Sequence, residues 1–574
     1  MNNNIAYLLI FMFLWYTTDT LSQKRGSMVR INNDDVSLPI NTSGIIGDVD
    51  IPDPNPSLDG PGGKYQQKLF LFSSGFLLSG YSNNVLWANG SRYSTTGKDY
   101  QAGIVGMSPS NPNAVIYKVD WDIPFGQGWL DWIDAVELGA GFYDGDADGI
   151  YNPVDKNGDG FWDPDEDKPE MLFLESYWCV FNDGVPSGQR QWDAEPQGIE
   201  IRQTITPFPA SSSSHITIRY KIKNTGLVAD TLEDVYFSIW SDPDIGDYSD
   251  DLGGSDTLRN SRYTYNDDDD AIYGIAPPAF LVTLLAGPHS YISGETFIDN
   301  NNNSVYDEGI DTPLDTAKYM SGELGINILP GAKNLKMTMS NQYYNSINDT
   351  NLRNPHTVQE ARNYMLGKNR IGSIIDPCNF SPYGEVRGGV PCDQVNPHFW
   401  FSGDPVYNVG WVATYPGDVI QLLTVGPFKL IKNQEVETQI AYIVSKGNNA
   451  LSAVTKVKSI ADTAIYWYNN NYGAPMVVSI QDNMETIYEY SLSQNYPNPF
   501  NPSTKISWQS PVGSWQVLKV FDVLGKEITT LVNEYKPAGI YEVEFNASGL
   551  SSGVYYYQII IGDNIQTKKM ILLR

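Results

Sequence analysis

The chain has 574 residues, of which 13% are aromatic and only 18% are charged. This length predicts about two to four folding units, and the aromatic-rich composition predicts a secreted, mainly β protein with a large core. The formal charge of −30 argues against nucleic acid as a partner, because phosphate backbones are bound by clustered Lys and Arg.

Residues 1–22 have the features of a secretory signal. The apolar run from Ile5 to Tyr16 is shorter than the roughly 20 residues that a membrane-spanning helix needs. Small residues follow it, so we predict cleavage near Ser22 and no transmembrane segment in the mature chain. The alternative interpretation of the apolar run is a buried β-strand.

Residues 23–64 are predicted to form an extended lead-in, because residues 45–64 are rich in Pro, Gly and Asp. Residues 65–472, called the passenger from here on, contain many short strand-like segments separated by Gly, Pro, Asn and Asp. This pattern predicts a multi-domain β-sandwich with a few helices. Its clearest segment, residues 216–223, alternates Ile and Tyr with Thr, Arg and Lys, which predicts a half-buried antiparallel strand.

Two helices are predicted in the passenger. Residues 357–367 begin with a capping box formed by Thr357 and Glu360 and stop at a glycine. Residues 451–468 place apolar side chains at helical spacing, and we interpret this stripe as core packing rather than a partner-binding face. Residues 473–490 follow as a predicted linker.

Residues 491–574 are predicted to form a compact β unit. The segment YEVEF places Tyr541, Val543 and Phe545 on the inward face and its two Glu on the outward face. Two further strand-like segments, GVYYYQIIIG and KKMILLR, are set apart by glycine turns. A unit with about six or seven short strands of this kind suits an immunoglobulin-like β-sandwich.

This unit contains four motifs in order: LSQNYPNPFNPSTKISW, VFDVLGKEITTLV, GIYEVEFNASGLSSGVYYYQI and KKMILLR. Together they closely resemble the C-terminal sorting domain, type A, of the type IX secretion system. The resemblance implies Sec export, passage across the outer membrane and a surface sortase that cleaves the domain, after which the passenger is anchored to lipopolysaccharide or released. The implied partners are the type IX secretion machinery and the sortase. Passenger segments such as LFSSGFLLSGYSNNVLWANG also resemble large Bacteroidetes-type surface proteins that carry the same domain.

The strongest chemical signal in the passenger is the segment 144–167, DGDADGIYNPVDKNGDGFWDPDED. Its oxygen side chains follow the register of an EF-hand-type calcium loop twice in succession, with a turn Gly at the sixth position. The first copy uses Asp144, Asp146, Asp148, the Ile150 carbonyl, Asn152 and Asp155. The second copy uses Asp155, Asn157, Asp159, the Phe161 carbonyl, Asp163 and Glu166.

Two prolines inside these copies depart from a true EF-hand, and the segment resembles the calcium loops of thrombospondin type 3 repeats or of dockerins. We expect a structural calcium ion, because carboxylates this dense repel one another until a divalent ion is bound. The alternative is a solvated acidic loop without metal.

A third candidate calcium loop contains Asp299, Asn301, Asn303 and Asp307, but it lacks the turn Gly and has Ile310 at position 12. Two other acidic segments, 242–251 and 267–270, have no diagnostic register. Either could complete a further cation site from separate loops, but a hydrated loop is the better interpretation of the second.

Catalytic motifs are not evident in the sequence. The four His residues have no metal-ligand spacing, and no nucleophile elbow or phosphate-binding loop is found. Cys378 and Cys392 are candidates for a disulfide, which would exclude a Cys392–His398 dyad, and Cys179 is expected to be a buried free thiol. The carboxylate pairs of glycosidases leave no local motif.

We therefore expect a calcium-stabilised structural or adhesive protein at the cell surface, where polysaccharide or a host or neighbouring surface is a possible partner. A secreted hydrolase that degrades polysaccharide or protein and a carbohydrate-binding protein are the alternatives. The Trp residues at 87, 129, 132 and 411 would form a sugar-stacking platform if exposed, whereas most Trp of an aromatic-rich β protein are core residues.

Overall fold

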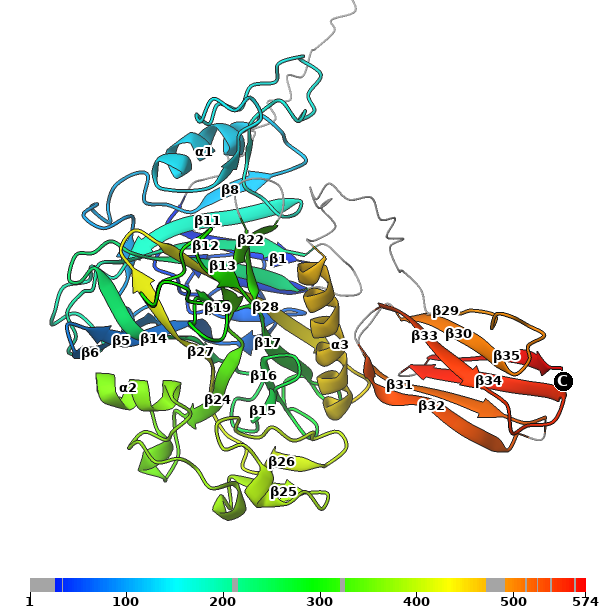
Figure 1. The fold of residues 1–574 in the computed structure, drawn as a ribbon. Helices are drawn as coiled ribbons and strands as arrows, with labels where there is room; N and C mark the ends of the chain where they lie inside the picture. Colours follow the sequence, from blue (N-terminus) through cyan, green and yellow to red (C-terminus); the bar gives the residue numbers. More distant parts are fainter. Residues whose placement is uncertain are drawn as a thin grey trace, which may run out of the picture.

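The computed structural model describes residues 26–33, 35–208, 215–320, 326–470, 491–510, 514–523, 525–536, 539–561 and 564–573. The predicted signal sequence and the predicted linker 473–490 lie outside these ranges. Within them strands dominate, and three α-helices lie on the outer faces of the sheets (Figure 1). The prediction of a mainly β protein is confirmed.

The passenger contains a nine-stranded and a five-stranded sheet, both antiparallel, packed face to face (Figure 1). The nine-stranded sheet comprises β15 (Leu252–Asp256), β16 (Ser261–Tyr265), β17 (Pro278–Ala286), β28 (Glu435–Lys446), β13 (Ile216–Asn224), β12 (Ile199–Pro207), β11 (Glu175–Asn182) and β7 (Gln101–Ala102), and β8 (Tyr117–Asp120) also pairs with β11. The five-stranded sheet comprises β24 (Met337–Tyr344), β27 (Val419–Ile431), β14 (Thr231–Asp242), β5 (Ser73–Ser82) and β6 (Val85–Ser91). Aromatic rings fill the space between the sheets: Phe76 of β5 lies 5.7 Å from Tyr220 of β13 and 5.9 Å from Phe181 of β11, centroid to centroid. The predicted β-sandwich is confirmed.

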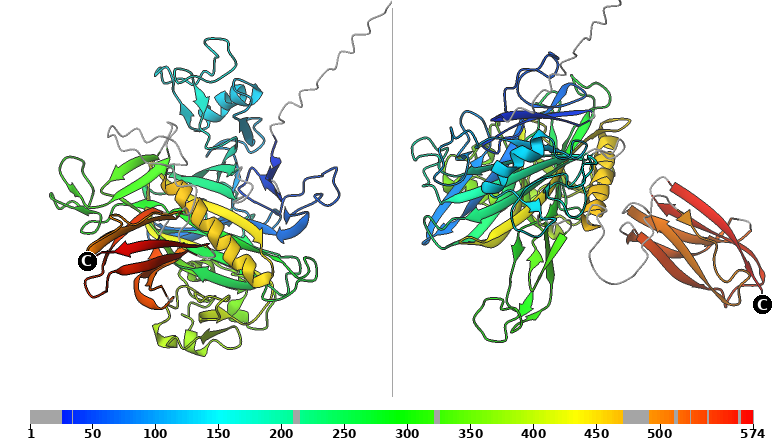
Figure 2. Two further views of the ribbon diagram at one scale, coloured as in Figure 1. Left: turned by 90° about the vertical axis from the view of Figure 1, so that its right-hand side faces the viewer. Right: turned by 90° about the horizontal axis from the view of Figure 1, so that it is seen from above.

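Each helix buries an apolar stripe against an outer sheet face. The helix α3 (Ala450–Asn469) packs Val454, Val457 and Ala461 against β17 and β28, as the predicted stripe requires; Figure 2 shows it lying along the sheet. The helix α2 (Val358–Met365) covers the five-stranded sheet. Its Thr357 side chain accepts from the Glu360 N–H as predicted, but the Glu360 carboxylate reaches the His356 N–H instead of Thr357.

The helix α1 (Gln127–Glu137) was not expected from the sequence. Its N-cap, Gly126, provides no side-chain hydrogen bond, and its first turn has no acidic residue, so the usual start signals are missing. It is held by its buried face instead: Trp129 and Trp132 are fully buried against Trp178 and its neighbours on β8 and β11. Tertiary packing therefore decides this helix.

The strand β13 is more deeply buried than its alternating pattern predicted. Thr217 and Arg219, expected to face solvent, are only 1% and 3% exposed. Arg219 makes a bidentate ion pair with the buried Glu170, at 2.9 and 2.7 Å, and Lys221 also lies within 3.5 Å of Glu170. Burial raises the pKa of Glu170, but the charges of Arg219 and Lys221 outweigh it and lower the pKa to about 2. The prediction of a half-buried strand was wrong. Arg219 can be buried on the predicted solvent face because Glu170, from a segment distant in sequence, covers it and pairs with its charge.

The prediction of an extended lead-in at residues 23–64 was also wrong. A four-stranded sheet contains β1 (Met28–Asn33), β2 (Val36–Asn41), β3 (Gly63–Tyr65) and β4 (Lys68–Leu71). Ile31, Leu38 and Ile40 are at most 1% exposed and belong to the main core. The two strands β1 and β2 form a tight hairpin whose apolar side chains are too few to predict a strand from local pattern alone.

Residues 491–573 form a separate β-sandwich with its own core (Figure 1). One sheet comprises β29 (Ser491–Leu492), β30 (Ser503–Ser510) and β33 (Gly539–Asn546), and the other comprises β32 (Glu527–Lys536), β31 (Ser514–Phe521), β34 (Gly553–Ile561) and β35 (Asn564–Leu572). Phe545 is buried while Glu542 and Glu544 are exposed, as predicted. The predicted two-sheet arrangement of this unit is confirmed.

The Asn- and Pro-rich segment 494–502 packs against this sandwich rather than extending away from it. Phe500 is 2% exposed, and its N–H donates to the Ile571 carbonyl at 2.9 Å. The Asn498 side chain accepts from the Ile571 N–H at 2.9 Å, and the Asn495 side chain donates to the Pro497 carbonyl at 3.1 Å. Prolines cannot donate from the backbone, so asparagine side chains add hydrogen bonds to the few that the backbone of this segment makes.

The described part of the passenger also contains five two-stranded antiparallel sheets. They are β9 (Phe142–Tyr143) with β10 (Lys168–Pro169), β18 (His289–Ser290) with β23 (Lys333–Asn334), β19 (Phe297–Ile298) with β20 (Thr312–Pro313), β21 (Thr316–Met320) with β22 (Ile326–Pro330), and β25 (Gly384–Arg387) with β26 (Gly410–Ala413). Three 3₁₀ turns are described at η1 (Thr350–Leu352), η2 (Pro377–Asn379) and η3 (Cys392–Gln394).

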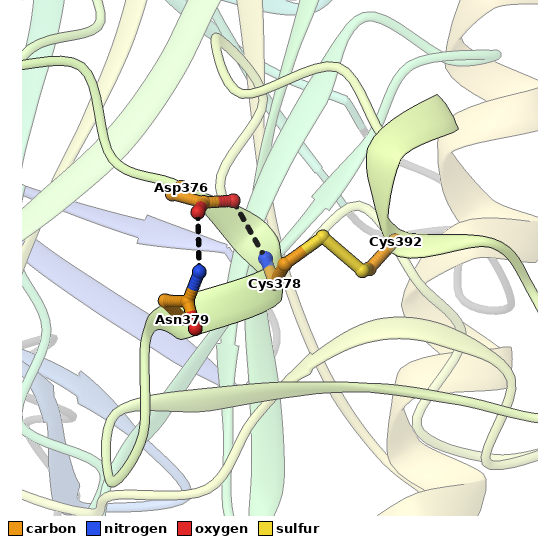
Figure 3. The surroundings of a disulfide bond; sticks show 4 residues. All are labelled: Asp376, Cys378, Asn379 and Cys392. Carbon is orange, nitrogen blue, oxygen red and sulfur yellow. Dashed lines mark hydrogen bonds between the residues drawn. A yellow bond between two sulfur atoms is a disulfide. The ribbon is translucent and has the colours of Figure 1, made fainter.

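A disulfide joins η2 to η3 through Cys378 and Cys392 (Figure 3). The Asp376 carboxylate caps η2 by accepting from the Cys378 N–H at 2.9 Å and from the Asn379 side chain at 2.6 Å. Because Cys392 is bonded to Cys378, it has no thiolate to serve as a nucleophile. Cys179 is a free, buried thiol, and burial raises its pKa to about 12.

Candidate calcium loops

The predicted calcium loops lie at the tips of two short hairpins. Residues 144–167 connect β9 to β10, and residues 299–311 connect β19 to β20. Each pair of two-residue strands brings the two ends of its acidic loop together. The sequence-predicted ligands are therefore gathered into two compact, solvent-facing tips.

The first position of every loop binds the backbone in the same way. A carboxylate accepts from the N–H five residues further on: Asp144 from Gly149 at 2.8 Å, Asp155 from Gly160 at 2.9 Å and Asp299 from Ser304 at 2.7 Å. The fifth position repeats as well, with its side-chain oxygen accepting from the N–H two residues on: Asp148 from Ile150 at 2.7 Å, Asp159 from Phe161 at 2.8 Å and Asn303 from Val305 at 2.8 Å. Three loops of different sequence thus adopt one conformation.

A closing carboxylate completes each loop by accepting from the N–H groups at its second and ninth positions. Asp167 accepts from Gly145 and Asn152 at 2.9 and 2.7 Å, Glu166 from Lys156 and Asp163 at 2.5 and 3.0 Å, and Asp311 from Asn300 and Asp307, both at 2.8 Å. Glu166 was predicted, whereas Asp167 and Asp311 were not. Asp311 follows the apolar Ile310, which stands at position 12. A loop pattern that accepts the closing carboxylate at position 12 or 13 would have predicted Asp311.

The first two loops are nested rather than consecutive. Asp155, which the sequence register assigned to both copies, directs both carboxylate oxygens to the second loop, accepting from Gly158 at 2.6 Å and Gly160 at 2.9 Å. The first loop closes on Asp167 instead, so residues 155–166 lie inside residues 144–167. One oxygen from each of Asp144, Asp146 and Asp167 lies within 4.8 Å of the other two, a spacing that suits a shared cation.

The remaining predicted ligands surround the same tips. The Asn157 amide donates to Asp163 at 2.7 Å, and the amides of Asn301 and Asn303 each donate to Asp307 at 2.7 Å. Ile150 and Phe161, whose carbonyls were predicted as ligands, are 66% and 73% exposed. Asn152 contributes its N–H to Asp167 and has an exposed side chain. Turning an amide by 180° presents its oxygen, since the two orientations have nearly the same shape.

These donors fit calcium better than a transition metal. Carboxylate, amide and carbonyl oxygens are hard ligands, and calcium accepts six to eight of them in flexible geometry. Positions four and six turn the chain through left-handed backbone: the fourth is Ala147, Gly158 or Asn302, and the sixth is Gly149, Gly160 or Ser304. Lys156 lies 3.4 Å from the Asp146 carboxylate, and a bound ion would supply positive charge for the other carboxylates of the loops.

The turn residue of the third loop gives a direct test of this conformation. Ser304 has φ +62°, where Gly149 and Gly160 occupy the same position of the other loops. A side chain at positive φ costs about 1–2 kcal/mol, and glycine gains flexibility in the unfolded chain. Ser304→Gly is expected to raise the free energy of unfolding by about 0.5–1 kcal/mol, measured by urea denaturation. Ser57→Gly, an exposed serine outside the left-handed region, is the matched control and should destabilise slightly; equal effects of the two changes would contradict the loop geometry.

The nested loops are anchored to the sandwich by aromatic residues. The Trp162 indole donates to the Glu166 carbonyl at 2.8 Å, and the buried Tyr151 hydroxyl donates to the Trp129 carbonyl of α1 at 3.0 Å. The Lys168 ammonium lies 4.3 Å from the centroid of the Trp162 ring. Ordering of these loops is therefore coupled to packing of α1.

The other sequence candidates are located as follows. Trp87, Trp129, Trp132 and Trp411 are at most 2% exposed, so they are core residues and no sugar-stacking platform. Asp267, Asp268 and Asp269 are exposed, as expected of a hydrated loop. Asp270 is only 3% exposed and accepts from the Asp247 and Ile272 N–H groups, so the prediction was wrong for this residue. The acidic segment that follows β14 is different, because Asp242 and Asp251 are buried.

Comparison with known proteins identifies the C-terminal sandwich. Residues 494–573 match the family model described as the secretion system C-terminal sorting domain. No curated protein sequence matches the chain. The matching solved structures include PorZ, a bacterial surface component of the type-IX secretion system of Porphyromonas gingivalis, with 10% identity, 70% coverage of this chain, 43% coverage of that chain and a TM-score of 0.14. The chain thus spans less than half the length of that protein.

The described helices include none that is long and apolar enough to cross a bilayer. The sorting domain directs its chain to the type IX secretion machinery. Because residues 494–573 form such a domain, the protein is a type IX secretion cargo that is released from the cell or displayed on its surface.

Proposed function

We propose that this cargo is a calcium-stabilised structural or adhesive protein of the cell surface. The observation that carries the calcium part is the common conformation of three loops, whose first, fifth and closing side chains make the same hydrogen bonds. Calcium would hold each loop closed and relieve the repulsion among its carboxylates. The ions have a structural role in this proposal, since the nested loops are held against α1, where the Tyr151 hydroxyl donates to the Trp129 carbonyl.

Further partners are proposed from the sorting domain. A surface sortase would cleave the chain before residue 491, and lipopolysaccharide would anchor the released passenger. Polysaccharide or a host or neighbouring surface is the proposed target of the passenger itself. The two-sheet body supports this role, because helices cover the outer faces of both sheets and leave a rigid scaffold that presents loops.

The test uses the protein purified from the secreted fraction and loaded with calcium. It is incubated with a panel of insoluble polysaccharides, and both retention on the solid and released reducing ends are measured. We expect retention on at least one polysaccharide without release of reducing ends. Release of sugar would overturn the non-enzymatic proposal in favour of a hydrolase, whereas neither retention nor release would leave a purely structural role.

A further inference from the structure

A cluster of three carboxylates lies at one end of the five-stranded sheet, apart from the calcium loops. Asp242 is the last residue of β14, and Asp418 immediately precedes β27. These strands are antiparallel neighbours, with Ser241 opposite Gln421, so the end of one meets the start of the other. Asp244 follows in the loop after β14, and one oxygen from each of the three carboxylates lies within 4.8 Å of the other two.

Asp242 is buried, Asp244 and Asp418 are half-buried, and the cluster lacks compensating charge. Asp242 is only 2% exposed, and its Oδ1 is buried without a hydrogen-bond partner. Its Oδ2 accepts from the Tyr93 hydroxyl at 2.8 Å, and Asp418 Oδ1 accepts from the Asn345 amide at 3.0 Å. Across the described ranges, no Lys or Arg forms an ion pair with any of the three carboxylates. Burying unpaired carboxylates is costly, so the arrangement needs a positive partner.

The electrostatics of the cluster agree with this requirement. Burial, followed by the charge of Asp418, raises the pKa of Asp244 to about 7. Burial and then the charges of Asp244 and Asp418 raise the pKa of Asp242 well above its ordinary value. Ionising all three neighbouring carboxyl groups costs free energy, because their negative charges repel one another. A bound cation removes this cost.

The three carboxylates line an open cavity of about 480 Å³. Tyr93, Tyr248 and Asn345 also line it, and the Asn345 N–H donates to the Asp418 carbonyl at 3.1 Å. The lining therefore combines hard oxygen ligands with aromatic rings. The three carboxylates come from segments far apart in the sequence, which the pairing of β14 with β27 brings together.

We propose that Asp242, Asp244 and Asp418 bind a divalent cation of the calcium class at this cavity. The unpartnered Asp242 Oδ1 points to a missing ligand, and an all-oxygen donor set favours calcium over zinc or copper. Three carboxylates supply only part of the six to eight oxygens that calcium takes. Water or an oxygen-rich ligand in the cavity completes the coordination, so this ion is accessible to ligands.

The test counts calcium ions by isothermal titration of the full secreted protein and of Asp242→Asn and Asp418→Asn. Each variant is expected to lose one site or to bind at that site at least tenfold more weakly. Asp268→Asn, which removes an exposed carboxylate outside every proposed site, is the matched control and should bind as wild type does. The difference between variant and wild type concerns this site alone, so its result is independent of the calcium loops. Unchanged stoichiometry and affinity in both variants would overturn the proposal.

Thermal unfolding in chelator and in calcium separates ion binding from a purely structural role. In chelator, Asp242→Asn is expected to unfold at a higher temperature than wild type, because the change removes one of three crowded carboxyl groups that then have no cation to join them. In calcium the order should reverse, because only wild type retains the full ligand set. The same order under both conditions would overturn the proposal, and a variant that unfolds cooperatively in chelator is shown to be folded.

Discussion

Without residues 491–574 the protein is expected to remain in the periplasm. The sorting domain is the part of the chain that matches the secretion family, so its removal takes away the signal for the outer-membrane step while leaving the passenger intact. Cell fractionation followed by immunoblotting measures the result: nearly all of the truncated protein should be periplasmic. Truncated protein at the surface in normal amounts would contradict this prediction.

A point variant tests whether the folded sandwich, rather than its sequence alone, is recognised. Trp508 is 2% exposed, and its indole donates to the Gln516 side chain at 2.6 Å. Trp508→Ala should destabilise this small unit by about 3–5 kcal/mol, a large part of the stability of an ordinary domain, and should reduce export. Tyr556→Ala, a partly exposed aromatic on β34 (37% exposed), is the matched control and should be exported nearly as wild type.

Removal of calcium is expected to produce the second large effect. If each loop binds with Kd about 10⁻⁴ M, as extracellular modules do, about 2 mM calcium stabilises the native state by about 2 kcal/mol per site. Three loops would then contribute about 5–6 kcal/mol, which chelation abolishes. Calorimetry should show a fall of many degrees in Tm, and limited proteolysis should cut first within residues 144–167 and 299–311.

Loop variants assign this effect to the proposed ligands. Asp155→Asn and Asp299→Asn remove the first-position carboxylates of two loops, so each should reduce the calcium-dependent rise in Tm by roughly one site's share. Asp268→Asn should leave that rise unchanged. An unchanged Tm of the wild-type protein after chelation would contradict the structural role of calcium altogether.

Much of the protein follows from local sequence patterns. Alternation in YEVEF places Phe545 inward, helical spacing at residues 451–468 predicts α3, and four motifs predict the sorting domain. The spacing of acidic residues in the calcium loops is also a local pattern. The first and fifth positions of each loop accept from N–H groups no more than five residues away. Covalent spacing decides such contacts.

Tertiary structure alone decided the remainder. The helix α1 has no local start signal and forms because Trp129 and Trp132 are buried. Arg219 lies in a strand whose apolar and polar residues alternate, which predicts that it faces solvent. Only the tertiary structure places Glu170 over it. The closing role of Asp167 depends on a second loop nested inside the first. Asp242 and Asp418 are far apart in sequence and meet only because β14 pairs with β27, and strand pairing over such distances is decided by burial of the whole core rather than by any local pattern.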